Sequence, residues 1–308
     1  MLLKRIVRRL RRAASPAEDA IFPLRPKLPL PQGVSEQQLF DFVTSVRVSN
    51  APEEEMRAYG THDFRRFVYT CGLAQGVSGK CLELGANPYF STMLLKQFTQ
   101  LDLSLANYFG PQTAGLASQT VAYKDFKTGT QSSCDFEYQH FNVENDTFPY
   151  ADQSFDLVIF AEIIEHLLND PCKVLREIKR VLKPNGVLIL TTPNVARLEN
   201  VAKLIGGENI YDPYSGYGPY GRHNREYNRH ELVKLLEFEG YEAQNHFTAD
   251  VHTNNAAAFA SVMQLKDQVN FRKDDLGQYI FIKAIKRDGQ PTLKPRWLYR
   301  SYPENQLA

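Results

Sequence analysis

The fold is decided by residues 156–192, which read DLVIFAEIIEHLLNDPCKVLREIKRVLKPNGVLILTT. One short apolar run, DLVIFA (156–161), opens this stretch, and another, VLILTT (187–192), closes it. Between them Asp170 and Pro171 predict a helix start, because Asp caps free amide groups and Pro fits the first helical turn. One face of that helix carries apolar residues at helical spacing: Val174, Leu175, Ile178, Val181 and Leu182. Strand, helix and strand in this order predict a parallel pair joined by a crossover helix.

The same alternation continues on both sides of this stretch. Short apolar runs separated by helical segments begin at Lys80 and resume after Gly240. The expected strands are 80–84, 101–106, 136–141, 156–161, 187–192, 241–248 and 278–285. The sequence therefore predicts an α/β domain with a seven-stranded, mostly parallel sheet and helices on both faces.

The segments outside this alternation divide the chain. The expected parts are a basic segment and proline-rich linker at 1–34, N-terminal helices at 35–79 (35–46 and 52–75), the α/β domain at 80–287 and a tail at 288–308. After the fifth strand, residues 195–228 interrupt the pattern with a segment rich in Gly and Tyr. A helix at 229–238 and the turn Glu239-Gly240 follow, since Gly is the usual residue just past a helix end.

Composition restricts the classes of protein that fit. The chain has 308 residues, a net charge of +1 and no apolar stretch approaching the roughly 20 residues of a membrane-spanning helix. Its four cysteines are widely spaced and form no Cys-x-x-Cys motif: Cys71, Cys81, Cys134 and Cys172. No pair of histidines has the spacing of metal ligands. We therefore expect reduced structural thiols, no metal site and a cytoplasmic protein that contacts at most the inner face of the membrane.

The first dozen residues concentrate positive charge. Six of these residues are Lys or Arg. The apolar residues among them recur at helical spacing: Leu3, Ile6, Val7 and Leu10. Residues 1–13 can therefore form a basic amphipathic helix that makes peripheral contact with an anionic membrane. A solvated basic tail is the alternative interpretation.

Ligand-binding residues are expected beyond the carboxyl ends of the parallel strands. After the first strand, Gly85 allows close backbone approach, and a new helix offers free amide donors. Later segments add specificity through their order and spacing: Asn142-Val143-Glu144, Phe148-Pro149-Tyr150, Ser154-Phe155-Asp156-Leu157-Val158, Glu162-Ile163-Ile164-Glu165-His166 and Arg180-Val181-Leu182-Lys183-Pro184-Asn185-Gly186. Over about residues 79–285 this series resembles the class I S-adenosylmethionine methyltransferases. It is most similar to small-molecule and lipid enzymes, including ubiquinone-pathway O-methyltransferases and those found with surface-polysaccharide biosynthesis.

The resemblance implies a Rossmann-like fold, S-adenosylmethionine as cofactor and a set of cofactor-binding residues. Glu83, Gly85 and Ala86 would lie under the methionine part, Asn107 at the ribose, Asn142 and Val143 at the adenine edge, and Ala161 and Glu162 on the other side. Two features depart from the family pattern. The glycine-rich turn has become Gly85-Ala86-Asn87-Pro88, and Asn107 replaces an acid that accepts bonds from both ribose hydroxyls, of which an amide accepts only one well.

Two histidines are candidates for a general base. His166 follows the fourth strand, and a histidine with a pKa near 6.5 can take a proton at neutral pH. His223 lies in Gly221-Arg222-His223, which is similar to the Gly-x-His segment of ubiquinone-type O-methyltransferases. The alternatives are a histidine that packs at a helix start for His166 and a surface-loop histidine for His223.

The insertion at 195–228 is predicted to be a lid over the substrate. Its tyrosines alternate with glycines that give mobility: Tyr211, Tyr214, Tyr217 and Tyr220. A packed Ω-loop without substrate contact is the alternative. Thr192-Pro193-Asn194 follows the fifth strand, whereas the Asn-Pro-Pro-Tyr motif of amino-group methyltransferases follows the fourth. The sequence therefore favours an oxygen acceptor over nitrogen.

These features favour an O-methyltransferase that acts on a sugar, glycolipid or lipid-linked intermediate at the cytoplasmic membrane face. The expected partner is accordingly a small-molecule, glycan or lipid acceptor. One alternative is an RNA or protein methyltransferase that uses the basic arm, although no long basic stripe supports a nucleic-acid partner. Another is a Rossmann-like domain that binds a nucleotide or partner without catalysis. A nicotinamide dehydrogenase is disfavoured because Gly-x-Gly-x-x-Gly is absent.

Overall fold

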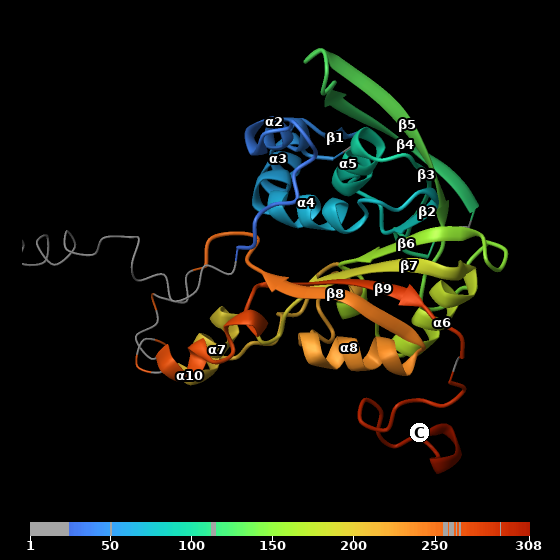
Figure 1. Cartoon of the computed structure of the whole chain (residues 1–308), viewed down its shortest axis with the longest axis vertical. Helices are drawn as coiled ribbons and strands as arrows, with labels where there is room; N and C mark the ends of the chain where they lie inside the picture. The colour runs from blue at the N-terminus through green and yellow to red at the C-terminus, as the bar shows by residue number, and fades with distance from the viewer. Residues whose placement is uncertain are drawn as a thin grey trace, which may run out of the picture.

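The structure is a computed structural model. It describes residues 25–49, 51–111, 115–254, 258, 262, 264, 266–289 and 291–308. The basic segment 1–13 lies outside these residues. Within them, the α/β prediction is confirmed, because a single twisted sheet carries helices on both faces (Figure 1).

Nine strands form this sheet within the described residues. They are β1 (Arg47–Val48), β2 (Gly79–Leu84), β3 (Leu101–Asn107), β4 (Gly115–Lys124), β5 (Gln131–His140), β6 (Phe155–Ala161), β7 (Leu182–Pro193), β8 (Tyr241–Ala249) and β9 (Tyr279–Lys286). Their order is β1-β4-β5-β3-β2-β6-β7-β9-β8. The central block β5-β3-β2-β6-β7 is parallel, and β9 runs antiparallel to both of its neighbours. The winding direction reverses between β2 and β6, where a ligand site is expected.

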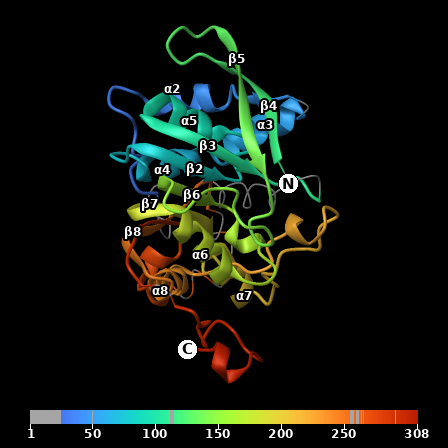
Figure 2. The same cartoon turned by 90° about the vertical axis from the view of Figure 1, so that its right-hand side faces the viewer.

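The strand count is a correction, since seven strands were predicted. The seven expected strands are present, and β1 and β4 are additional. β4 pairs antiparallel with β5, which begins at Gln131 instead of the expected 136. Half of the side chains in this hairpin are exposed and only four are buried, so its sequence carries polar residues and lacks the apolar run that marks a buried strand. In Figure 2 the hairpin projects from the end of the molecule opposite the C-terminal tail.

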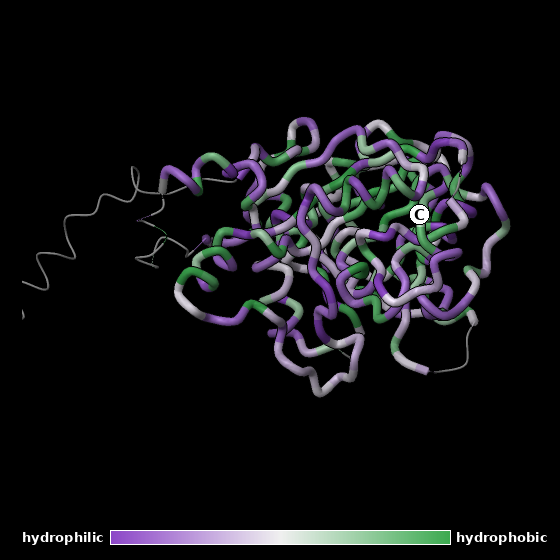
Figure 3. Tube along the Cα trace, turned by 90° about the horizontal axis from the view of Figure 1, so that it is seen from below, coloured by the Kyte–Doolittle hydropathy of each residue, from purple (hydrophilic) through white to green (hydrophobic). Residues whose placement is uncertain are grey.

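The helices lie in two layers. They are α2 (Glu36–Val43), α3 (Glu53–His62), α4 (Phe64–Leu73), α5 (Phe90–Phe98), α6 (Pro171–Val181), α7 (Leu198–Ile205), α8 (Arg229–Phe238) and α10 (Lys266–Asn270). Helices α2–α5 cover one face of the sheet, and α6 and α8 cover the other (Figure 1). β6 contributes to both cores, Leu157 and Ile159 to one and Val158 and Phe160 to the other. Apolar residues gather in the middle of the molecule (Figure 3).

The capping signals at two helices are confirmed. Asp170 accepts a hydrogen bond from the Lys173 amide, and Pro171 occupies the first helical position of α6. α8 spans the predicted residues, and Gly240 follows it with φ +77°. These ends were predictable because caps depend on a few neighbouring residues.

The single helix expected at 52–75 is instead broken into α3 and α4. Asp63 lies between them with non-helical backbone angles. Its carboxylate pairs with Arg66, 3.3 Å away, and Asp side chains commonly compete with helical backbone bonds. The break directs the buried Arg66 toward the carboxyl end of β6, where Glu162 lies 3.8 Å away.

The insertion and the C-terminal tail, for which no helix or strand was predicted, both contain defined structure. α7 lies inside the 195–228 insertion and packs with residues near α10 in a small separate core. The tail folds back on itself through a β-bridge between the backbones of Lys294 and Leu307. It is also joined to the start of α6, because the Tyr299 hydroxyl donates to Asp170 at 2.6 Å. Among the described residues, no helix combines the length and apolarity needed to cross a membrane.

Candidate functional site

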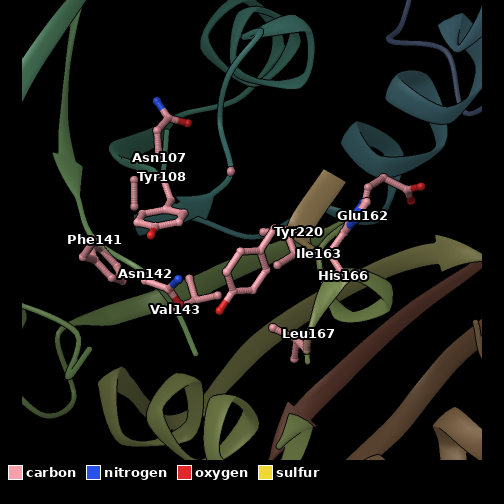
Figure 4. Close-up of a pocket in the computed structure, with 12 residues that line it drawn as sticks. Asn107, Tyr108, Phe141, Asn142, Val143, Glu162, Ile163, His166, Leu167 and Tyr220 are labelled. Atoms are coloured by element: carbon pink, nitrogen blue, oxygen red, sulfur yellow. The ribbon is translucent and has the colours of Figure 1, made fainter. Parts of the chain in front are cut away.

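A cavity of about 180 Å³ opens at the carboxyl ends of the parallel strands (Figure 4). The ends of four strands supply its walls, with Gly85 after β2, Asn107 as the last residue of β3, Asn142 after β5 and the segment 162–167 after β6. The insertion adds Tyr220. The cavity therefore lies where the winding of the sheet reverses.

The structure brings most of the predicted cofactor residues together here. Five of them line the cavity: Gly85, Asn107, Asn142, Val143 and Glu162. Ala86 and Ala161 are adjacent in sequence to these residues, and Glu83 lies two residues before Gly85, but none of the three lines the cavity. Of the two predicted bases, His166 lines it.

The turn after β2 depends on Gly85. Its φ is +67°, and a Cβ at this position would lie 2.9 Å from Cδ1 of Ile163. The Gly85 and Ala86 amides both donate to the Ala106 carbonyl, at 2.8 and 3.2 Å. A side chain at Gly85 would therefore strain the backbone and press into the cavity wall.

Glu83 supports this turn from below. Its carboxylate is buried and accepts a bond from the Thr92 hydroxyl on α5 at 2.6 Å. Burial raises the pKa of Glu83 to about 7, and the Thr92 bond only partly offsets that rise. Glu83 thus links β2 to the helix that begins beside the cavity.

Asn107 forms bonds within the protein rather than pointing into the cavity. Its Oδ1 accepts from the Asn87 amide at 2.8 Å, and its Nδ2 donates to the Tyr89 hydroxyl at 3.0 Å. In Figure 4 its side chain points away from Tyr220. Asn107 therefore holds the altered turn in place by accepting one hydrogen bond and donating another. A carboxylate at this position could accept from the Asn87 amide but could not donate to Tyr89.

Asn142 and Tyr220 meet on the opposite wall. Oδ1 of Asn142 accepts from the Glu144 and Asn145 amides at 2.9 and 3.1 Å, which fixes the loop after β5. The Tyr220 ring lies across the cavity, edge-to-face with Tyr108 at 6.1 Å between ring centroids (Figure 4). Its hydroxyl donates to Glu144 at 3.2 Å.

The other predicted lid tyrosines do not reach this cavity. Tyr211, Tyr214 and Tyr217 are 85%, 93% and 95% exposed. Tyr214 contacts the guanidinium of Arg222, 4.8 Å from the ring centroid. Of the four predicted lid tyrosines, one thus lines the cavity and three lie at the surface.

His166 and His223, far apart in sequence, are adjacent in space. Their ring centroids are 5.0 Å apart. His166 Nδ1 lies 2.9 Å from the Arg222 carbonyl, which can only accept, so this nitrogen donates. His223 Nδ1 bonds Glu226 at 2.8 Å. In both rings Nε2 is left for other partners.

Glu165 completes a group that could hold a metal ion. Ligand atoms of Glu165, His166 and His223 all lie within 4.8 Å of one another. The Oε1 atom of Glu165 is buried without a hydrogen-bond partner among the described residues, whereas its Oε2 accepts from Thr192 at 2.8 Å. Imidazole and carboxylate ligands suit a divalent cation, and each imidazole is oriented through its other nitrogen, as in protein metal sites. This group departs from the expectation of no metal site, because its ligands come from two distant loops and share no sequence spacing.

The electrostatics of this group differ between its members. Burial, aided by Glu162, raises the pKa of Glu165 to about 8. Burial lowers the pKa of His166, and the nearby His223 lowers it further. The pKa of His223 is raised, because the bond to Glu226 and the charge of Glu165 outweigh burial. His166 is therefore the neutral imidazole at pH 7.

Glu162, whose backbone φ is +56°, contacts a network of buried charged groups. Thr191 donates to Glu162 at 2.7 Å, and Arg66 lies on its other side. The Tyr59 hydroxyl accepts from Arg66 at 2.6 Å. We did not predict Arg66 as a site residue, and the Asp63-x-x-Arg66 spacing at the start of α4 is the sequence signal that could have indicated it.

A second cavity of about 500 Å³, here named the polar chamber, lies beside the first. Its lining residues come from α3, the end of β7, the insertion, the loop after β8 and the start of β9: His62, Pro193, Arg197, Glu199, Lys203, Asp212, His223, Glu226, His252, Thr253, Gln278 and Tyr279. Because His166 lines the first cavity and His223 the second, the two cavities meet at the histidine pair.

Comparisons with known proteins agree on one family. Residues 83–190 match the family described as a methyltransferase domain. A protein of Mycolicibacterium smegmatis named as a probable S-adenosylmethionine-dependent methyltransferase is 34% identical over 97 residues, 32% of each chain. A ubiquinone biosynthesis O-methyltransferase of Pasteurella multocida is 26% identical over 192 residues, 58% of this chain and 73% of that protein. A solved S-adenosylmethionine-dependent methyltransferase from Thermotoga maritima is 18% identical, covering 76% of this chain and 95% of its own, with a TM-score of 0.45. The chain spans about a third of the length of the first of these relatives.

Proposed function

We propose that this chain, which belongs to the class I S-adenosylmethionine-dependent methyltransferases through its residues 83–190, methylates a hydroxyl group of a sugar, glycolipid or lipid-linked acceptor. One observation carries the proposal. The cavity at the strand ends and the polar chamber meet at His166 and His223. A methyl donor in the first cavity and an acceptor in the chamber would therefore face each other across the two imidazoles.

The residues present fit S-adenosylmethionine in the first cavity. Gly85 leaves open a space that a Cβ would fill, and Asn142 and Val143 offer a fixed loop at the far end. When bound, the cofactor supplies an electrophilic methyl group on a sulfonium. What the chain contributes is positioning, which alone can supply much of the rate.

The histidine pair supports an oxygen acceptor. Since Nδ1 of His166 donates to the Arg222 carbonyl, its Nε2 carries the lone pair that can take a hydroxyl proton. A divalent cation held by Glu165, His166 and His223 would act in the same direction, because it lowers the pKa of a bound hydroxyl. An amine acceptor that is already neutral would need neither device.

Calorimetric titration with S-adenosylhomocysteine, followed by transfer of labelled methyl from S-adenosylmethionine to glycan and lipid extracts, tests the proposal. We expect micromolar binding and label in a hydroxyl-bearing acceptor. Absence of binding would overturn the proposal and support a domain that binds a partner without catalysis, an outcome compatible with the internal bonds of Asn107.

A second experiment separates the two ways of activating the hydroxyl. Turnover would be measured after chelation, after return of Mg²⁺, Mn²⁺ or Zn²⁺, and in the variants His166→Ala, His223→Ala and Glu165→Gln. Loss of a general base costs about 100-fold or more. Chelator-sensitive activity that returns with metal assigns the cation, and chelator-resistant activity that fails only in a histidine variant assigns the base. Unchanged turnover in all three variants contradicts both roles.

A further inference from the structure

We infer that the polar chamber is the acceptor site and that it takes a polyhydroxylated sugar ring rather than an apolar aromatic or a lipid chain. This inference rests on the proposed methyl transfer, because it places the acceptor across the histidine pair from the methyl donor. His223, one member of that pair, lines the chamber together with Glu226, to which it is hydrogen-bonded. The chamber is also the larger of the two cavities.

The two cavities differ sharply in chemistry. The first is lined largely by apolar and aromatic side chains, such as Phe141, Ile163 and Leu167. Among the described residues that line the chamber, every side chain except Pro193 carries a polar or charged group. An apolar ligand would leave any group that lacks a partner within the protein, such as Oε2 of Glu199, buried and unsatisfied, at a cost of about 1–3 kcal/mol. A ring that carries several hydroxyls can instead pair with such groups.

Glu199, in the first turn of α7, identifies a specific hydrogen-bond acceptor. Its Oε1 accepts from Gln278 at 2.7 Å, whereas its Oε2 is buried without a partner among the described residues. Gln278 is itself fixed, since its Oε1 accepts from the Val251 and His252 amides. The carboxylate is therefore held rigidly with one oxygen that a ligand hydroxyl can satisfy.

Hydrogen-bond donors and flat surfaces complete the set. Arg197 and Lys203 lie near Glu199 on the same element and can donate to ring or hydroxyl oxygens. The rings of His62 and His252 lie against each other with centroids 4.1 Å apart, and Tyr279 lies 6.5 Å from His252. Such surfaces suit the C–H face of a sugar, while the polar edges select its hydroxyls.

The test compares the full-length wild type with Glu199→Gln, which keeps the carbonyl bonded by Gln278 but replaces the free oxygen with an amide group. The matched control is Glu208→Gln, an exposed position in the same insertion. The probes are methyl glycosides of glucose, N-acetylglucosamine and glucuronic acid, with catechol and octanol as apolar competitors. Saturation-transfer NMR reports binding, and labelled-methyl transfer reports KM and kcat.

We expect the wild type to bind and methylate at least one glycoside. Glu199→Gln should raise its KM about tenfold or more, with kcat changed by less than about threefold, as for lost ground-state binding. Glu208→Gln should match the wild type, and all three proteins should bind S-adenosylhomocysteine equally.

Failure of this inference and failure of the proposed function give different results. Glycoside binding that is equal in Glu199→Gln, or preference for catechol or octanol over every glycoside, would overturn the sugar assignment while leaving methyl transfer intact. Glycoside binding that depends on Glu199 without any methyl transfer would keep the chamber assignment and overturn the proposed function. Loss of S-adenosylhomocysteine binding in Glu199→Gln alone would indicate misfolding, and Glu199→Asp, which shortens the reach of the carboxylate, then provides the same comparison.

Discussion

At the scale of single residues, Glu83 connects stability to pH. Its pKa in the folded protein is about 7, above the ordinary value of 4.5, so the folded state favours the protonated acid. Such a group contributes its full stability below pH 4.5 and loses it as pH rises through 7. Its charge therefore opposes folding increasingly across this window.

Glu83→Gln should remove this dependence, since glutamine keeps an oxygen for the Thr92 hydroxyl without a charge. Relative to wild type, the free energy of unfolding of the variant should grow by about 3 kcal/mol between pH 4.5 and pH 8. Urea unfolding at several pH values measures this difference. Exposed Glu208→Gln should show no such trend, and a constant offset for Glu83→Gln would contradict the shifted pKa.

At the same scale, the turn after β2 tests the fit of the cofactor. Gly85→Ala adds a Cβ both at positive φ and 2.9 Å from Ile163. Gly129→Ala is the matched control, because Gly129 has φ +72° but nothing within 4 Å of its added Cβ. Both variants should lose about 1 kcal/mol of stability from backbone strain. Only Gly85→Ala should also weaken S-adenosylhomocysteine binding, by about tenfold or more in calorimetry, and equal affinities would show that the turn does not touch the cofactor.

At the scale of elements, the insertion 195–228 connects the two cavities. The side-chain amide of Asn224 donates to the His166 carbonyl at 2.9 Å, and the backbone amide of Asn224 donates to the Glu165 carbonyl at 2.7 Å. The segment that carries Tyr220 and His223 is thus bonded to the loop after β6. A shift of the insertion at one cavity would therefore displace residues that line the other.

The first cavity, which Tyr220 helps to line, has a volume of about 180 Å³, below the roughly 300 Å³ at which pockets for such ligands begin. We therefore expect Tyr220 to move aside when the cofactor binds. Tyr220→Ala should raise the association rate of S-adenosylhomocysteine about tenfold in surface plasmon resonance, whereas Tyr217→Ala, at an exposed position, should not. A slower rate or weaker affinity in Tyr220→Ala would show instead that the ring supports the bound cofactor.

At the scale of the whole molecule, the proposed acceptor site is built from parts of the chain that are distant in sequence. The polar chamber takes residues from α3, the end of β7, the insertion, the loop after β8 and the start of β9, and no local motif marks it. The described residues form no helix fit to cross a membrane. Membrane contact therefore stays a prediction about the basic segment 1–13, which lies outside them.

Deletion of residues 1–13 tests that prediction. Because six cations lie in the first dozen residues, the deletion should weaken binding to anionic vesicles and leave neutral vesicles unaffected. Sedimentation with vesicles of phosphatidylglycerol or phosphatidylcholine measures both. Equal partitioning of the two proteins would contradict the membrane contact, and calorimetry with S-adenosylhomocysteine confirms that the deleted protein is folded.

The sequence by itself determined the elements whose signals are local. α6 starts where predicted, and α8 both starts and ends where predicted, because Asp170, Pro171 and Gly240 act on neighbouring backbone groups. α6 ends at Val181, so Leu182, predicted on its apolar face, instead begins β7. The buried strands were predictable from their apolar runs, and their parallel order places the loops at Gly85 and Asn142 at one edge.

Only the tertiary structure decided the rest. The break at Asp63 depends on Arg66 and on a strand about a hundred residues away, and β4 is held by its pairing with β5 rather than by an apolar run of its own. The group of Glu165, His166 and His223, and the free oxygen of Glu199, arise where separate loops meet. Local backbone preferences act over a few residues, whereas contacts between distant side chains exist only once the sheet has brought their loops together.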